Sequence, residues 1–448
     1  MSKNKLSRRG FIKLSGAALA AGASGGLPGL AQAAPKGVST GKKAYLPKAR
    51  GPRVVVVGGG TSGLTIAKYL KIENPGFDVV LVEKRAMYSS CFSSNLWYAD
   101  VIDLEFLAGH SFLDAAKRGG YVFFNATCTG VDRAGRKVHT DQGEIAYDYL
   151  VLAPGIDYDY ARIGVNDPDT EYRLRTGYPA GWMTGAEHVS IKRKIENFKG
   201  GVFIQTVPGG NFRCKPAPYE RTCMIASYFK KHKIKGKVLV LDNNPDIAVK
   251  KDGFHAAFNE LYKDYVEYVP SVNITGVDAD AKTIRTEFDS YDFDEAAIYP
   301  GVRASKLIEV AGLVDAKSPQ KEARIDVRKY HVPGDSRVYV TGDSRPMGFP
   351  KSAHLANSEG KYVAKVIAAH AAGKTIDWTS PASLCYSMVN TAPQEAISMW
   401  VSFSYDTTAK AFSPAKESTG TDEKRDAAKG AATLDWAKAL YGDLFGEG

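Results

Sequence analysis

Residues 53–63 read Arg-Val-Val-Val-Val-Gly-Gly-Gly-Thr-Ser-Gly, and this stretch decides the fold. Four consecutive valines are β-branched and apolar, which is typical of a parallel strand buried on both faces. The glycines predict a tight turn, and residues 64–70 predict a helix after it. A second apolar strand at residues 79–82 ends at Glu83. The segment therefore predicts the strand–helix–strand unit that opens a Rossmann-type α/β fold.

The glycine spacing of this unit predicts a dinucleotide site. Gly58 permits the tight turn, Gly60 lets the backbone approach a pyrophosphate, and Gly63 lets helix and strand pack closely. The helix start would offer unpaired N–H groups to the phosphates. Glu83 follows Gly63 by 20 positions, where an acid can bind ribose hydroxyls. A glycine-rich turn without function is the alternative, but the strand, helix and acid together favour the site.

Two later strand ends resemble those of flavoproteins with two dinucleotide-binding domains. Residues 150–155, Leu-Val-Leu-Ala-Pro-Gly, resemble the family's "ATG" strand motif, which in this chain ends at Gly155. Residues 339–343, Tyr-Val-Thr-Gly-Asp, resemble its second FAD motif, in which Asp343 after Gly342 would hold the ribityl chain. The resemblance implies that the cofactor is FAD. The alternative for Gly342 and Asp343 is a surface turn after a strand.

A second α/β block lies between these motifs, with strands predicted at residues 201–204 and 237–241. The turn at residues 206–211, Thr-Val-Pro-Gly-Gly-Asn, does not have the glycine fingerprint. Pro208 would also disturb the helix start that holds a pyrophosphate. We therefore predict that this block binds no nicotinamide cofactor and that electrons come from another donor.

The order of these motifs predicts several domains after the N-terminal segment. A stretch rich in Gly, Ser, Thr and Lys around residues 415–430 predicts a loop near the end of the chain. The predicted domains are an FAD-binding domain at 34–160 and 300–375, a degenerate nucleotide-binding-like domain at 161–299, and a C-terminal α+β flavin/interface domain at 376–448.

The first 33 residues predict a twin-arginine export signal. Arg8 and Arg9 lie in a basic segment, an apolar stretch follows at residues 14–30, and Ala31-Gln32-Ala33 supplies small residues for cleavage. A membrane anchor is the alternative, but the apolar stretch is rich in Gly and Ala and contains a proline. We therefore expect the mature protein in the periplasm.

Composition excludes several other classes. The 448 residues carry a net charge of +10, and half of it lies in the first 33 residues, which removes most of the support for nucleic-acid binding. No other run of about 18 apolar residues occurs, so no integral membrane segment is predicted in the mature chain. The eight histidines do not cluster as metal ligands do, and no metal is predicted.

Sequence around three of the five cysteines resembles the flavoprotein subunit of flavocytochrome c sulfide dehydrogenase, a family related to sulfide:quinone oxidoreductase. The most specific run is residues 212–221, Phe-Arg-Cys-Lys-Pro-Ala-Pro-Tyr-Glu-Arg. The others are Tyr-Ser-Ser-Cys at 88–91, Pro-Lys-Ser-Ala at 350–353 with Ala-Asn-Ser at 356–358, and Leu-Cys-Tyr-Ser at 384–387. The resemblance covers nearly all of the mature chain and implies a glutathione-reductase-like fold.

The resemblance gives three of the five cysteines a role. It implies that Cys91 is bonded through sulfur to the 8-methyl carbon of FAD, the alternative being a buried structural cysteine. It implies a redox-active disulfide between Cys214 and Cys385, the alternative for Cys385 being a free buried thiol. Cys128 and Cys223 match no role; we interpret them as structural, and a second disulfide between them is the alternative.

Charged residues of the same runs also acquire roles from the resemblance. Glu220 matches an acid/base near the disulfide, and Lys351 matches a lysine at the pyrimidine edge of the flavin. The alternatives are a surface ion pair of Glu220 with Arg221 or Arg213, and a solvated surface charge at Lys351. We also expect Arg213 and Lys215 to favour a thiolate at Cys214.

The function implied is oxidation of sulfide to sulfur or polysulfide, with electrons passing to a c-type cytochrome subunit in a heterodimer. The chain has no Cys-x-x-Cys-His run, so it carries no c-type haem of its own. One alternative is a sulfide:quinone oxidoreductase, with residues 434–445 as a membrane-facing or docking helix. The other is a non-catalytic flavoprotein that serves as an assembly partner.

Overall fold

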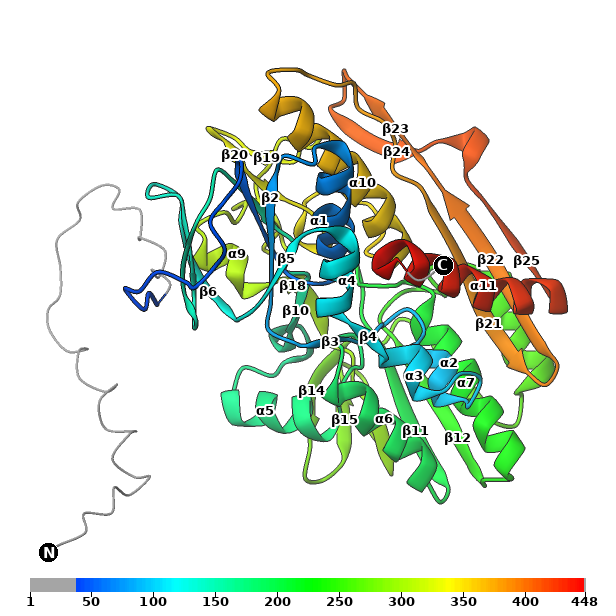
Figure 1. Ribbon diagram of the computed structural model, residues 1–448. Helices are drawn as coiled ribbons and strands as arrows, with labels where there is room; N and C mark the ends of the chain where they lie inside the picture. Colours follow the sequence, from blue (N-terminus) through cyan, green and yellow to red (C-terminus); the bar gives the residue numbers. More distant parts are fainter. Residues whose placement is uncertain (1–37, 447–448) are drawn as a thin grey trace, which may run out of the picture. The chain divides into compact units, whose positions relative to one another are not determined.

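The structure is a computed structural model that describes residues 38–446 (Figure 1). The predicted export signal lies outside the described residues. Within them, two largely parallel sheets with flanking helices are followed by an antiparallel sheet and a long helix. This confirms the predicted fold class of two Rossmann-like domains with a C-terminal α+β part.

The first sheet contains the valine-rich strand at its centre. Its strand order is β19–β20–β9–β1–β2–β5, and all neighbours are parallel except β19 and β20. Val54, Val55 and Val56 have no exposed surface, as a strand covered on both faces requires. The strands are β1 (Arg53–Val57), β2 (Asp78–Glu83), β5 (Val122–Asn125), β9 (Tyr149–Leu152), β19 (His331–Val332) and β20 (Asp335–Val340).

Two helices pack together on this sheet and bring distant parts of the sequence to one place. Helix α1 (Thr61–Glu73) lies beside α10 (Ala353–Ala371) (Figure 1). The side-chain amide of Asn357 donates to the Thr65 hydroxyl at 3.0 Å, and a Cβ at Gly360 would lie 3.0 Å from the Cβ of Thr65. This close approach places residues 351–356 next to the glycine turn.

The second sheet has the order β13–β12–β11–β17, with all strands parallel. After β11 the chain forms α7 (Ala217–His232), whose residues from Ala217 to Phe229 are all buried. A helix that is buried along most of its length suits a position between two layers. The strands are β11 (Gly201–Val207), β12 (Gly236–Asp242), β13 (Val266–Val269) and β17 (Glu295–Ala297).

The antiparallel sheet consists of β21 (Ser383–Thr391), β22 (Gln394–Val401) and β25 (Gly420–Asp426). Strand β21, which contains Cys385, packs against α7. This contact places Cys385 beside the second Rossmann-like domain. The prediction of a loop around residues 415–430 is wrong, because β25 and the start of the next helix occupy most of this range. Pairing with β22 satisfies the β25 backbone although its side chains are mostly polar, so tertiary context overrides composition.

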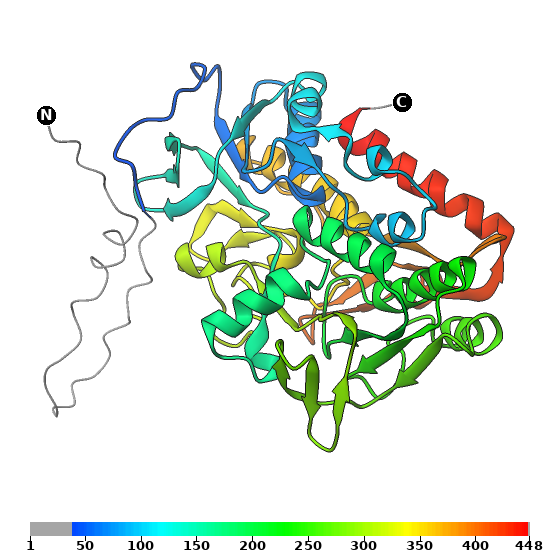
Figure 2. The same cartoon turned by 90° about the horizontal axis from the view of Figure 1, so that it is seen from below.

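Helix α11 (Ala427–Phe445) packs against α1, α4 (Phe112–Gly119) and β22. In both views it lies beside the cyan part of the chain (Figures 1 and 2). Leu440, Tyr441, Leu444 and Phe445 are buried, so this helix docks on the protein with its apolar side. No helix among residues 38–446 combines the length and apolar character that a membrane crossing requires.

These three sheets take their strands from four segments of the chain, in the order that the motifs predicted. Strands of the first sheet come from residues 53–152 and 331–340, those of the second from residues 201–297, and those of the third from residues 383–426. The exact domain boundaries proposed from sequence stay a prediction.

The packing of the glycine turn gives a test of the fold. A Cβ at position 63 would lie 1.8 Å from the carbonyl oxygen of Gly58, which is backbone and cannot rotate away. We expect Gly63→Ala to lower the free energy of unfolding by about 1–3 kcal/mol, measured by urea denaturation followed by circular dichroism. Gly60→Ala is the control, because a Cβ there meets nothing within 4 Å. Equal stabilities of the two variants without flavin would contradict this packing.

Candidate functional site

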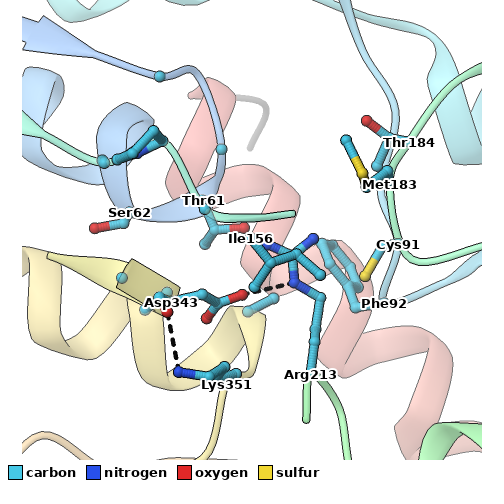
Figure 3. Close-up of a pocket in the computed structure, with 18 of the residues that line it drawn as sticks. Thr61, Ser62, Cys91, Phe92, Ile156, Met183, Thr184, Arg213, Asp343 and Lys351 are labelled. Carbon is cyan, nitrogen blue, oxygen red and sulfur yellow. Dashed lines mark hydrogen bonds and ion pairs between the residues drawn. The ribbon is translucent and has the colours of Figure 1, made fainter. Parts of the chain in front are cut away.

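A cavity lies where the first sheet, α10 and the loop before α7 meet (Figure 3). Its wall includes most of the residues singled out from sequence. Only one cysteine of the predicted disulfide, Cys214, lines it. The predicted site residues on the wall are Gly58, Gly60, Glu83, Cys91, Cys214, Gly155, Gly342, Asp343 and Lys351.

The glycine turn has the geometry that a dinucleotide requires. Gly58 has φ +105°, and a Cβ there would lie 2.3 Å from the carbonyl oxygen of Ala153. At Gly60 the Cβ position is open toward the cavity, with no atom within 4 Å. Helix α1 begins at Thr61, so its first N–H groups face the same space. The turn, the open position and the helix start fit the pyrophosphate of FAD.

Glu83 lies at the end of β2 and is fixed by several donors. The N–H of Gly59 donates to its carboxylate at 2.8 Å, and Arg85 donates through both its backbone N–H and its guanidinium. Burial acts to raise the pKa of Glu83, but the charge and hydrogen bonds of Arg85 outweigh burial and lower it. Glu83 is therefore an ionised acceptor at the position predicted for ribose recognition. Arg85 was not predicted.

Asp343 and Arg213 form a buried ion pair inside the cavity (Figure 3). The Nε of Arg213 donates to Oδ2 of Asp343 at 2.6 Å, and its Nη1 donates to the Trp182 carbonyl at 2.7 Å. Burial favours the protonated form of Asp343, yet Arg213 and Lys351 hold its pKa below the ordinary value. The expectation that Arg213 favours a thiolate at Cys214 is therefore wrong, since the guanidinium points to Asp343.

Lys351 is buried, so the alternative of a solvated surface charge is wrong. Its Nζ donates to the Glu322 carboxylate at 2.5 Å and to the Asp343 carbonyl at 3.0 Å. Burial lowers the pKa of Lys351, and Glu322 opposes that effect. The lysine lines the cavity as predicted, but with a counter-ion that sequence did not reveal.

Cys91 lies on the cavity wall beside Phe92, on the side of Met183 and Thr184 (Figure 3). Its segment is held by α11: the Tyr441 hydroxyl donates to the Ser90 hydroxyl at 2.6 Å, and the Phe92 ring lies 5.1 Å from that of Tyr441. Burial raises the pKa of the Cys91 thiol. Its place on the wall favours a cofactor role over the structural alternative.

Cys214 has φ +57°, a left-handed conformation that is uncommon for a residue with a side chain. Its N–H donates to the Lys351 carbonyl at 2.8 Å, which attaches the loop to the FAD-binding domain. Burial raises the pKa of Cys214, and the neighbouring Cys385 adds to this effect. The two predicted partners therefore lie near each other. All five cysteines are separate thiols in the structure, and the disulfide stays a prediction.

Glu220 lies in the first turn of α7 and is buried, so the alternative of a surface ion pair is wrong. The Asn95 amide donates to one carboxylate oxygen at 2.7 Å, and the N–H of Met388 donates to the other at 2.8 Å. Burial raises the pKa of Glu220. Arg221 instead donates to Asn95 and to two backbone carbonyls. A buried carboxyl beside two thiols can take or give a proton.

Lys250 is a further residue of this group that sequence reasoning missed. Its Nζ lies 3.9 Å from the sulfur of Cys385 and donates to the Ser387 hydroxyl at 2.6 Å. Lys250 and Cys385 are far apart in sequence and no motif contains Lys250, so no signal was available.

The other two cysteines lie apart from this group. Cys223 is fully buried in α7 within the core of the second domain, and Cys128 packs against the core of the first. They therefore fit the structural interpretation. No group of three or more His, Cys, Asp and Glu among residues 38–446 is arranged to hold a metal ion.

The acid at the end of β12 bears on the prediction that no nicotinamide cofactor binds. Asp242 has no exposed surface and accepts hydrogen bonds from the hydroxyls of Tyr219 and Tyr268, at 2.7 and 3.0 Å. The N–H of Asn244 donates to the other oxygen at 2.8 Å, so both carboxylate oxygens are engaged by the protein itself. The absence of a nicotinamide site stays a prediction, and these contacts favour it.

Two family models match the chain. Residues 189–300 match the central part of the flavoprotein chain of sulfide dehydrogenase (flavocytochrome c), and residues 52–173 match pyridine nucleotide-disulphide oxidoreductases. The sulfide dehydrogenase flavoprotein chain of Chlorobaculum thiosulfatiphilum is 49% identical over 43 residues, which is 10% of this chain and 90% of that sequence.

Sulfide:quinone oxidoreductases are also similar. The mitochondrial enzyme of Dictyostelium discoideum is 28% identical over 200 residues, 42% of this chain and 40% of that one. The matches to three such relatives span only 22–41% of their lengths. The solved sulfide:quinone oxidoreductase of Aquifex aeolicus has a TM-score of 0.72 at 17% identity, covering 88% of this chain and 92% of that one. The putidaredoxin reductase complex has a TM-score of 0.60 at 16% identity, covering 79% and 82%. At these identities the structures show the fold alone.

Burial of Glu220 predicts how stability depends on pH. Because its pKa is higher in the folded than in the unfolded protein, its stabilising contribution is complete below about pH 4.5 and is lost as pH rises through the folded value. The stability of the wild type relative to Glu220→Gln should therefore fall in urea denaturation as pH rises above about 4.5. Glu105→Gln, at an exposed position, is the control. Parallel stability curves for wild type and Glu220→Gln would refute the shift.

Proposed function

The chain belongs to the family of flavoprotein chains of flavocytochrome c sulfide dehydrogenase, and we propose that it oxidises sulfide with bound FAD and passes the electrons to a c-type cytochrome. One observation carries this proposal. Cys214 lies on the wall of the FAD cavity, and Cys385 and the buried carboxyl of Glu220, which do not line the cavity, are close enough to act on the Cys214 thiol through their charges. Sulfur chemistry and flavin chemistry can therefore occur in contact.

The residues of the cavity fit FAD along its length. The glycine turn would hold the pyrophosphate, Glu83 the ribose hydroxyls, and Asp343 the ribityl chain. Lys351 and Cys91 lie on the same wall, toward the flavin end that the resemblance implies. When bound, FAD supplies a two-electron acceptor.

We propose that Cys214 and Cys385 are bridged in the resting enzyme. Hydrosulfide attacks one sulfur, one S–S bond breaks and another forms, and the products are a cysteine persulfide and a cysteine thiolate. A bound FAD would supply the two-electron acceptor that allows the Cys214–Cys385 bond to re-form as the S–S bond to the outer sulfur breaks and that sulfur leaves. In the overall change H₂S would lose two electrons and two protons. Burial raises the pKa of both thiols, so a base is needed to remove their protons. Glu220 is placed to accept and return one of them.

The electron acceptor and the compartment belong to the same proposal. The name of the matched family includes a flavocytochrome c, and the chain has no haem attachment motif, which supports a separate cytochrome subunit. The arginine pair at the N-terminus supports export to the periplasm by the twin-arginine route.

A quinone is the alternative acceptor, favoured by the similarity to sulfide:quinone oxidoreductases. The helix that could have faced a membrane is α11, but its apolar side is buried against the protein. The purified protein should reduce a c-type cytochrome in a sulfide-dependent way. Reduction of a soluble quinone analogue, without reduction of cytochrome, would favour the alternative. If neither cytochrome nor quinone is reduced, the result would favour the alternative of a non-catalytic flavoprotein that serves as an assembly partner.

Attachment of FAD through Cys91 predicts how the flavin behaves on denaturation. Flavin should remain with the wild-type protein after acid precipitation, because a thioether survives loss of the fold. Cys91→Ala should release all of it into the supernatant, measured by absorbance. Cys128→Ser is the matched control and should retain the flavin. Release of flavin from the wild type would exclude the covalent bond.

The proposed bridge predicts the number of reactive thiols. Of the five cysteines, two should react in the denatured, unreduced protein, and four should react after reduction because Cys91 remains bonded to flavin. Cys214→Ser and Cys385→Ser should each abolish reduction of the flavin by sulfide, measured by bleaching, whereas Cys128→Ser should not. Four reactive thiols before reduction, or sulfide-dependent bleaching in Cys214→Ser, would reject the disulfide mechanism.

A further inference from the structure

The ammonium group of Lys250 is buried and has few hydrogen-bond acceptors around it. Lys250 is 2% exposed and lies immediately before α8 (Lys251–Ala256). The Ser387 hydroxyl, 2.6 Å away, accepts one of its three hydrogens, and the next neighbour is the sulfur of Cys385 at 3.9 Å. Among residues 38–446 no carboxylate forms an ion pair with it. A buried cation without an anionic partner is costly, and such groups mark functional sites.

The charged groups around Cys385 come from two helices. Lys250 faces it from the start of α8, and Glu220 faces it from α7, while the Cys214 thiol lies in the loop before α7. Glu220 is held by Asn95 and by the backbone of Met388; the charge of Lys250 acts to lower its pKa, but the two groups form no ion pair. Burial raises the pKa of Cys385, and Lys250 is the strongest influence that lowers it.

The two cysteines therefore differ in their surroundings. Cys214 lines the FAD cavity, whereas Lys250 and Cys385 do not. Burial raises the pKa of both thiols, Glu220 adds to the rise and Lys250 opposes it at both, but only the Cys385 sulfur lies 3.9 Å from the ammonium group. A negative charge shared between the two sulfurs is thus most stable at the one beside the ammonium group.

We propose that Lys250 is a charge-stabilising residue of the redox pair, whose ammonium group holds the negative charge on the Cys385 sulfur when the Cys214–Cys385 bridge opens. The role rests on the proposed function, because it requires that the pair be opened by hydrosulfide. In that step the bridge breaks, a new S–S bond forms to the incoming sulfur, and the charge of hydrosulfide passes to the cysteine that leaves. A cysteine whose thiolate is stabilised leaves faster. Ser387 positions the ammonium group through its hydrogen bond.

The test measures the acidity of the Cys385 thiol directly in the full-length holoprotein. The protein is reduced, freed of reductant without oxygen, and treated with iodoacetamide over a range of pH. Alkylation of each cysteine is then quantified by peptide mass spectrometry. In Lys250→Met the midpoint for Cys385 should move up by at least about one pH unit, a tenfold fall in thiolate at fixed pH. Lys250→Arg should restore it.

Controls separate charge from structure. Lys251→Met removes an adjacent exposed ammonium group that pairs with Asp246, and should leave the Cys385 midpoint unchanged. Lys250→Gln keeps a donor for Ser387 without the charge. It should shift Cys385 as Lys250→Met does, and it replaces that variant if methionine prevents folding. A wild-type midpoint in folded Lys250→Gln, judged by its flavin spectrum, overturns the proposal.

The alkylation midpoint of Cys385 can be measured whether or not the disulfide mechanism is correct. The measurement uses reduced thiols and no sulfide, so it gives the same answer whether or not Cys214 and Cys385 are bridged in the resting enzyme. If the bridge is absent, the thiol count fails while the Lys250 effect on Cys385 remains. If Lys250 does not act on Cys385, the thiol count stands and only the alkylation profile stays unchanged.

Discussion

The ion pair between Arg213 and Asp343 connects the two halves of the site. Asp343 ends the second FAD motif of the first domain, and Arg213 directly precedes Cys214 in the second. Both side chains are largely buried, so either charge alone would be costly there, and each makes the other tolerable. Because Cys214 also donates its N–H to the Lys351 carbonyl, the sulfur has a fixed position relative to the cavity. The chemistry of the site depends on this attachment.

Charge is arranged differently on the two sides of Cys214. Toward the cavity, three ion pairs form: Glu83 with Arg85, Asp343 with Arg213, and Lys351 with Glu322. Away from the cavity, Glu220 and Lys250 are buried and have only neutral hydrogen-bond partners. The flavin side therefore has its buried charges paired, whereas the sulfur side holds a buried carboxyl and a buried ammonium group without ion pairs of their own.

The sequence predicted the parts of the site that are formed by contiguous residues. The glycine turn, Glu83 and the Gly342–Asp343 turn follow strands directly, and strand ends of a parallel sheet meet at one edge, so their convergence could be foreseen. Lys250, Glu322 and Asn95 could not, because each acts through a contact across the fold that leaves no local pattern. The prediction that Arg213 acts on Cys214 failed for a related reason. Adjacency in sequence does not determine which residue a long side chain pairs with, and Arg213 pairs with Asp343. The strand at 420–426 was missed because its pairing with β22, not its composition, makes it a strand.

The contacts of α11 determine when the site can come into existence. Tyr441 and Trp436 pack on the segment around Cys91, and Tyr88 of the same segment packs on Phe445. These residues are separated by about 350 positions, so the wall around Cys91 cannot close while the chain is still being synthesised. A nascent protein can form the glycine turn early, but it cannot enclose a cofactor until residues 427–445 have been made and have docked. Enclosure of the cofactor therefore depends on the helix at residues 427–445 having been made and docked.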